Sequence, residues 1–178
     1  LVRLGRWRVP AEGGWNPLQP LRTTQRNVYG RPSYCWCGSM ACGVAAAVKG
    51  MKPSARVWGV ETEGADTMAQ ALAAGHPIDL PAITSIAKTL GAPAVTSSTL
   101  ALAQQLFESV TVVPDSEAVE AMVFILERLK VMTEPAAACT LAAAHRLKEN
   151  FAPDTTLVLV FCGGNTGTKD LCGYLRDF

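Results

Sequence analysis

The chain has 178 residues, of which 49% are hydrophobic and 17% are charged, and its net charge is +1 at pH 7. A chain of this length is expected to form one domain or little more, and it is too apolar for a disordered protein. The near-zero charge offers no basic surface for nucleic acid or an anionic membrane, no apolar run reaches the roughly 18 residues of a membrane span, and the N-terminus lacks the apolar core of a signal peptide.

The six cysteines indicate a reduced, cytoplasmic protein. Cys139 and Cys162 lie within apolar stretches, where a free cysteine behaves as a small buried hydrophobe. Cys35 and Cys37 have the look of a metal-binding pair, but no second pair of histidines or cysteines at suitable spacing completes a zinc site.

Residues 1–38 differ in character from the rest of the chain. Up to about residue 34 the segment is rich in arginine, tryptophan and proline, and neither helical nor strand periodicity persists there. The sequence therefore predicts an irregular arm over 1–38 and a regular region over 39–178.

The first regular elements are short and compact. Small residues over 40–49 predict a slim helix that packs closely on a sheet. A strand is expected over 56–61, and the helix after it begins at Asp66 or Thr67 and ends at Gly75. A further helix over 98–107 and a strand over 110–113 complete this half.

The clearest helix begins after Pro114, where one apolar stripe recurs at helical spacing through Val119, Met122, Val123, Leu126 and Leu129. The next helix begins at Glu134 and Pro135, and its alanine-rich body over 136–148 is expected to be well buried.

Residues 155–162 form a continuous, mostly β-branched and apolar run without alternation, which is typical of a central parallel strand covered on both sides. Alternating strands and helices predict an α/β fold with a parallel or mostly parallel twisted sheet and helices on both faces, in three layers.

Three places in the sequence could carry chemistry. Gly163 and Gly164 end the predicted strand at 155–162, so the backbone there either approaches a flat or anionic ligand or makes a plain strand-to-helix turn. Glu61 ends a buried strand and needs a partner, which is a cation, a salt bridge or solvent at an exposed strand end. Glu134 has a structural reason to stand at a helix start, because an acidic residue is favourable there.

Four segments, taken together, resemble the C-terminal half of the L-serine/L-threonine dehydratases, which are pyridoxal-phosphate enzymes of the second structural class. Their large domain has the fold class predicted above, so 39–178 is expected to be the C-terminal part of a cofactor-binding domain. The segments that carry the resemblance are 60–67, 81–91, 133–138 and 161–165.

The resemblance also implies site residues. Cys162 would lie against the pyridine nitrogen of pyridoxal phosphate, with Gly163 and Gly164 beside it. A neutral thiol there would not fix a proton on the ring nitrogen, which moderates the ring as an electron sink. The start of the helix at Glu134 would support the pocket.

Two further groups of residues are implied in the same way. Gly38, Ser39 and Met40 would approach the phosphate of the cofactor. A monovalent cation, expected to be potassium, would be held mostly by backbone oxygens near Glu61, Ala65, Thr67, Leu90 and Ala92.

The sequence departs from the family pattern upstream. The phosphate cradle, which is a run of glycines in the family, has only one glycine over 36–39. Residues 1–38 are unlike the family, as a shifted reading frame or a gene rearrangement would make them. None of the six lysines has the Ser-x-Lys-x-Arg or similar setting of the Schiff-base lysine, so no catalytic residue is expected in this chain: Lys49, Lys52, Lys88, Lys130, Lys148 and Lys169.

For an intact enzyme the resemblance implies a lyase that eliminates the β-hydroxyl of serine or threonine and releases a 2-oxo acid and ammonia. The chain is expected to act on a small amino acid and to form a homodimer, without nucleic acid or membrane partners. Two alternatives stay open, namely a non-catalytic remnant that binds a complete subunit and an unrelated α/β nucleotide-binding domain.

Overall fold

The computed structural model describes residues 36–153 and 155–178. These residues belong to one compact unit that runs from Tyr34 to Phe178. Most of the predicted arm, up to residue 35, therefore lies outside the described residues.

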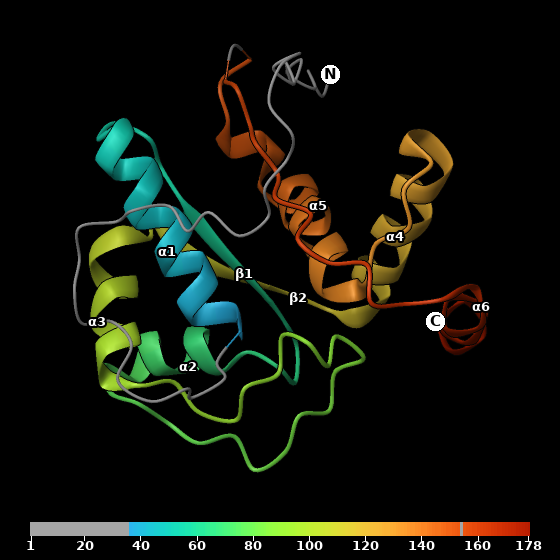
Figure 1. Cartoon of the computed structure of the whole chain (residues 1–178), viewed down its shortest axis with the longest axis horizontal. Coiled ribbons are helices and arrows are strands. Elements are labelled where there is room, and N and C mark those ends of the chain that lie inside the picture. Colours follow the sequence, from blue (N-terminus) through green and yellow to red (C-terminus); the bar gives the residue numbers. More distant parts are fainter. Residues whose placement is uncertain (1–35, 154) are drawn as a thin grey trace, which may run out of the picture. The chain divides into compact units, whose positions relative to one another are not determined.

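Two parallel strands form the sheet and lie between two groups of helices (Figure 1). Strand β1 (Trp58–Thr62) pairs with β2 (Ser109–Val113) from Trp58 opposite Ser109 to Thr62 opposite Val113. Both strands were predicted, and their parallel pairing needs the long helical crossover between them. The predicted α/β fold with a parallel sheet and helices on both faces is confirmed.

One face of the sheet is covered by α1 (Trp36–Met51), α2 (Thr67–Ala74) and α3 (Ser97–Leu106) (Figure 1). Helix α1 packs on α3, and α2 contacts both α3 and β2. The small residues of α1 allow this close packing, as the sequence predicts. The core between these elements is built from Cys42, Met68, Ala71, Ala92, Val95, Leu100 and Ala103.

The second face is covered mainly by α5 (Pro135–Leu147), which contacts both strands and also packs on α4 (Asp115–Leu129). The alanine-rich body of α5 is buried, as predicted. On α4, Val119 and Met122 are buried as expected, but the contact runs through Ile125, whereas Leu129 at the helix end is 37% exposed.

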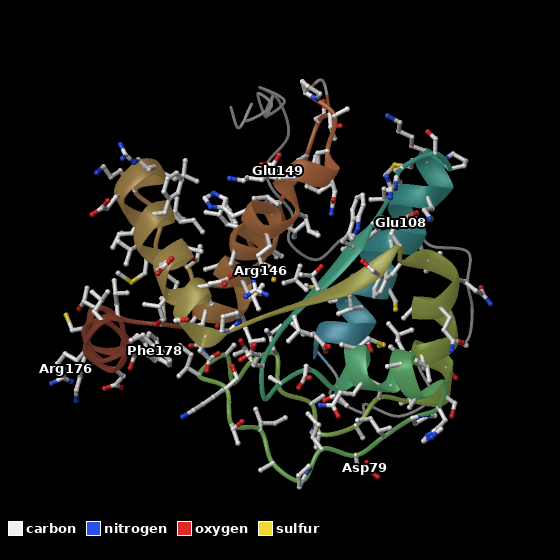
Figure 2. The ribbon with its side chains drawn as sticks, turned by 180° about the vertical axis from the view of Figure 1, so that it is seen from behind. Asp79, Glu108, Arg146, Glu149, Arg176 and Phe178 are labelled. Carbon is white, nitrogen blue, oxygen red and sulfur yellow. The ribbon has the colours of Figure 1, made fainter. Side chains whose placement is uncertain are left out.

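The chain ends in a short 3-10 helix, η1 (Lys148–Asn150), and in α6 (Thr168–Asp177), which the sequence analysis did not predict. Leu171 is the buried anchor of α6, while Arg176 and Phe178 lie at its exposed end (Figure 2). None of the described helices combines the length and the hydropathy needed to cross a bilayer.

The prediction of a central strand over 155–162 is wrong for the described chain. These residues are extended but form no strand, and Val158 is 77% exposed. Only Leu159 and Phe161 pack against the core. Cys162 is exposed rather than buried, although Cys139 is fully buried as expected. The physical reason is that a strand needs a neighbouring backbone, and none of the described segments lies in register beside this run.

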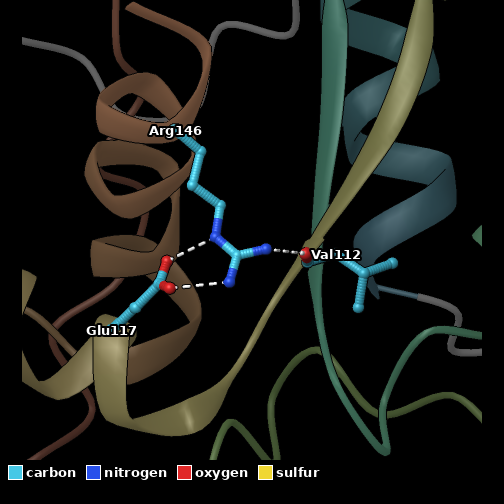
Figure 3. A network of polar contacts seen from close by, with 3 residues as sticks. All are labelled: Val112, Glu117 and Arg146. Atoms are coloured by element: carbon cyan, nitrogen blue, oxygen red, sulfur yellow. Dashed lines mark hydrogen bonds and ion pairs between the residues drawn. The ribbon is translucent and has the colours of Figure 1, made fainter.

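A bidentate ion pair joins the two helices of the second face (Figure 3). Arg146 of α5 donates from Nε and Nη2 to the carboxylate of Glu117 in α4, at 2.7 and 2.6 Å. Its Nη1 also points to the carbonyl of Val112 in β2, at 3.5 Å. The guanidinium thus ties α4, α5 and the sheet together at the surface.

Candidate functional site

The turn formed by Cys162, Gly163 and Gly164 lies against the start of α5. The amide of Glu134 donates to the carbonyl of Gly163 at 3.2 Å. A Cβ on Gly163 would stand 1.9 Å from Oε1 of Glu134, and a Cβ on Gly164 would stand 3.1 Å from the Met132 carbonyl. Only glycine fits this turn, because the helix start occupies the space that a side chain would need.

Glu134 and Cys162 are close enough to influence each other electrostatically. Glu134 is only 8% exposed, and its carbonyl accepts the amides of Ala137 and Ala138 at the start of α5. Partial desolvation of the Cys162 thiol, with the negative charge of Glu134, raises the pKa of Cys162. The thiol is therefore neutral near pH 7.

Two threonine hydroxyls beside this turn were not singled out by the sequence analysis. Thr133 Oγ1 and Thr166 Oγ1 are buried and have no hydrogen-bond partner within the described residues. Thr166 stands just after the turn, where its amide donates to the Gly164 carbonyl at 2.8 Å. A buried orphan hydroxyl is unusual in a complete protein, so both indicate a missing neighbour. Their positions directly next to Glu134 and Asn165 are the only signal that the sequence offered.

The residues predicted to approach the phosphate lie in the first turns of α1. Gly38 is buried, and Ser39 and Met40 are exposed. Amides in the first turn of a helix are free to bind an anion, which favours Gly38 and Ser39. Met40 is the fifth residue of α1, where a regular helix uses the amide internally.

Glu61 has found its partner in a helix. Its carboxylate accepts the amides of Met68 at 3.2 Å and Ala69 at 2.8 Å, at the start of α2. The preceding residue, Asp66, makes no side-chain cap, so Glu61 caps this helix from the end of β1. Burial nevertheless raises the pKa of Glu61 to about 7, against the lowering effect of the two amides.

Two of the other residues predicted to surround a cation are joined directly. Thr67 Oγ1 donates to the carbonyl of Ala92. The Ala69 amide, which a longer helix would direct to the Ala65 carbonyl, goes to Glu61 instead. The Leu90 carbonyl accepts the Ala92 amide at 3.0 Å. Ala65, Leu90 and Ala92 are all buried.

The loop between α2 and α3 is fastened to the ends of the strands by a network that the sequence analysis missed. The Ser85 hydroxyl lies 2.8 Å from that of Thr62 in β1 and donates to Asp115 Oδ1 at 2.6 Å. Gly64 has φ +80°, and its carbonyl accepts the Thr84 amide at 3.0 Å. Gly64 therefore adopts the left-handed turn expected of it, and its carbonyl bonds the loop.

The described residues contain no group of three or more His, Cys, Asp or Glu side chains arranged to hold a metal ion. A cation beside Glu61 would therefore depend on backbone oxygens. All six lysines lie within the described part of the chain; Lys49 is partly exposed at the end of α1, and the other five are exposed.

Comparison with known proteins covers most of the described chain. The sequence profile of the pyridoxal-phosphate dependent enzymes matches residues 35–163. Phenylserine dehydratase of Ralstonia pickettii is 35% identical over 139 residues, which are 78% of this chain and 42% of that protein. A serine dehydratase-like protein of Mus musculus is 40% identical over 114 residues, 60% of this chain and 35% of that protein.

The fold agrees with the sequence comparison. Maize serine racemase superposes with a TM-score of 0.68 at 34% identity, covering 79% of this chain and 44% of that one. A bacterial-type threonine deaminase, from the source abbreviated T.th., also gives 0.68, at 29% identity, over 74% of this chain and 47% of that one. The chain thus spans less than half the length of these relatives. By its profile match, its relatives and its fold, the chain belongs to the family of pyridoxal-phosphate dependent enzymes and is not an unrelated nucleotide-binding domain.

Proposed function

We propose that this chain forms the ring-side wall of the cofactor site in a lyase that converts serine or threonine to a 2-oxo acid and ammonia. The observation that carries the proposal is the close packing of the turn at Gly163 and Gly164 on Glu134. The names of the relatives, phenylserine dehydratase and serine dehydratase-like protein, support the substrate class.

The residues of the turn fit pyridoxal phosphate on its ring side. The two glycines offer flat backbone without side chains, and the Cys162 thiol beside them is exposed and neutral. The orphan hydroxyl of Thr166 is a polar group still in want of a partner next to the same turn. A planar aromatic ring with one nitrogen at its edge suits these donors and this flat surface.

The part played by Cys162 follows from its protonation state. Bound pyridoxal phosphate supplies an electron sink for the bonds to the α-carbon of an amino acid. A neutral thiol at the ring nitrogen does not hold a proton there as a carboxylate would, so the sink stays moderate. Moderate electron withdrawal suits prompt loss of a β-hydroxyl.

On the phosphate side we propose Gly38 and Ser39 as the residues whose first-turn amides face the anion, with Met40 next to them. Only Gly38 in this group is free of a side chain, so the cradle is less open than a run of glycines would be.

A monovalent cation, potassium, is proposed beside Glu61. The raised pKa of this buried carboxyl shows that the two amides of α2 do not fully compensate its charge. A cation held by Glu61 and by carbonyls of Ala65, Leu90 and Ala92, with Thr67, would supply the missing compensation without a carboxylate cluster.

The base that removes the α-proton must come from outside this chain. An amine that takes up a buried cofactor cannot remain in bulk solvent, and five of the six lysines are exposed, while the sixth, Lys49, ends α1. We propose that the lysine is supplied by the part of the enzyme that the relatives have and this chain lacks. Assembly as a homodimer of complete units is proposed with it.

The test is to coexpress the full chain with the portion of the Ralstonia phenylserine dehydratase that precedes the matched region. The complex should release 2-oxo acid from L-serine or L-threonine, whereas neither part alone should do so. A complex that carries the cofactor and converts L-serine only to D-serine would contradict the lyase and indicate a racemase.

One alternative has an observation in its favour. The exposure of the lysines also fits a non-catalytic partner that binds a complete subunit. In that case the coexpressed portion would form a complex without any product from either amino acid, and a complete relative would bind the chain as well.

A further inference from the structure

The segment between Thr155 and Phe161 is an extended chain with only one covered side. Leu159 and Phe161 pack against the core beneath it, while Val158 is 77% exposed and Val160 is 44% exposed. In Figure 1 it follows η1 as a coil beside α5, without an arrow. An extended run that alternates between covered and exposed apolar side chains has the side-chain pattern of a strand.

The backbone of this segment is also unused. No backbone hydrogen bond joins residues 156–162 to any other described segment. Unpaired N–H and C=O groups in an extended chain are a template for another strand. The exposed valines prefer a half-buried pleated surface, which a neighbouring strand would provide.

Three observations indicate what covers the segment. The chain spans only 42% of one curated relative and 44% of a superposed structure, so most of the relatives' length has no counterpart here. The segment leads directly into the turn at Cys162, at the end of the region matched by the family. Residues 155–165 carry no charged side chain, so the surface selects an uncharged partner.

We infer that residues 156–161 are the acceptor for an uncharged β-strand of the complementary part of the enzyme, which pairs with them and holds the turn at Cys162 in place. The inference rests on the proposed function, since it identifies the partner of the same site. It explains why a segment with every local property of a strand does not form one by itself. A second copy of this chain is the competing occupant.

The test uses the same coexpressed complex and measures hydrogen exchange of the amides of 156–161. In the complex, exchange of these amides should slow by at least about tenfold relative to the chain alone, since ladder hydrogen bonds must open before exchange. Val158→Pro removes one amide from the ladder and should abolish both the complex and the slowing. Val158→Thr keeps the amide and the β-branched shape, and should retain both.

Val158 is exposed in the chain alone, so both variants should melt there at the same temperature as the parent, which separates loss of pairing from loss of folding. No complex, a complex without slowed exchange, or a Val158→Pro variant that still pairs would overturn the inference. Slowed exchange in the chain alone that grows with its concentration would also overturn it, in favour of a second copy. A complex with slowed exchange but no 2-oxo acid would leave the inference intact and overturn the proposed lyase; product without slowed exchange would do the reverse.

Discussion

The carboxylate of Glu61, near the end of β1, accepts the amide of Ala69 at 2.8 Å and so caps a helix that follows it in the chain. Strand end, turn and helix start are held together by one buried acidic side chain, which is 5% exposed. Burial raises the pKa of that side chain to about 7. The same contact therefore links the local fold, the pH dependence of stability and the proposed cation.

The first prediction concerns pH. Because the folded protein holds the Glu61 proton more tightly than the unfolded chain, the free energy of unfolding should fall as pH rises from about 4.5 to about 7. The stabilisation is complete below the lower value, and on the order of 3 kcal/mol is lost by pH 8. Urea unfolding in tetramethylammonium buffer measures this loss.

The matched variant is Glu61→Gln, which cannot ionise. Its free energy of unfolding should change much less over the same range, and the two proteins should be most alike near pH 5. The exposed neighbour supplies the control, because Glu63→Gln should keep the slope of the parent. An unchanged slope in Glu61→Gln would assign the pH dependence to another group.

The second prediction concerns the cation. At pH 8, replacing tetramethylammonium by potassium should stabilise the parent by about 1–3 kcal/mol through binding to the folded state. The gain should shrink at pH 5, where the protonated Glu61 attracts a cation weakly, and should disappear in Glu61→Gln. Equal stability in both salts at pH 8 would rule out the proposed potassium site, and thermal melting decides the matter.

The third prediction concerns the glycine turn. Gly163→Ala places a methyl group where Glu134 Oε1 lies, so it should destabilise the protein by about 1–3 kcal/mol. Gly43→Ala is the control, because nothing stands within 4 Å of its added methyl and alanine favours the α1 helix. In a Glu134→Ala background the cost of Gly163→Ala should fall, since the carboxylate is gone. A cost that stays the same would mean that another group fills the space.

The fourth prediction concerns the surface ion pair in Figure 3. Arg146 is 45% exposed, so Arg146→Ala should cost only about 0.5–1 kcal/mol in low salt, and less in high salt. Arg146→Lys should not restore the loss, because lysine cannot reproduce the bidentate contact with Glu117. Arg176→Ala, at the exposed end of α6, should have almost no effect. A salt-independent loss would point to packing of the arginine stem instead.

Local signals in the sequence predicted the elements whose stability is local. Gly75 ends α2 in the left-handed conformation, and the apolar spacing around Met122 correctly indicated α4. The α/β class followed from these elements in order. The helix α6 has one buried residue, Leu171, and its surface-helix pattern was too weak to predict it.

Properties that depend on a distant partner could not be predicted. The β-branched run around Val158 states a preference for a strand, but pairing requires a second backbone that no local pattern supplies. Similarly, the sequence showed that Glu61 needs a partner without showing that the amides of α2 meet it. Thr133 gives no sign in the sequence that its hydroxyl is buried beside Glu134.

The most direct measurement of the central claim is the rate at which iodoacetamide alkylates each cysteine of the coexpressed complex, with and without pyridoxal phosphate. Cys162 and Cys172 are exposed, and Cys42 and Cys139 are buried, so the chain contains its own controls. If Cys162 lies at the ring, the cofactor should slow its alkylation and leave Cys172 unaffected, whereas inorganic phosphate should protect neither. Equal rates at Cys162 with and without the cofactor, in a complex shown to bind it, would contradict the placement of the cofactor against this turn.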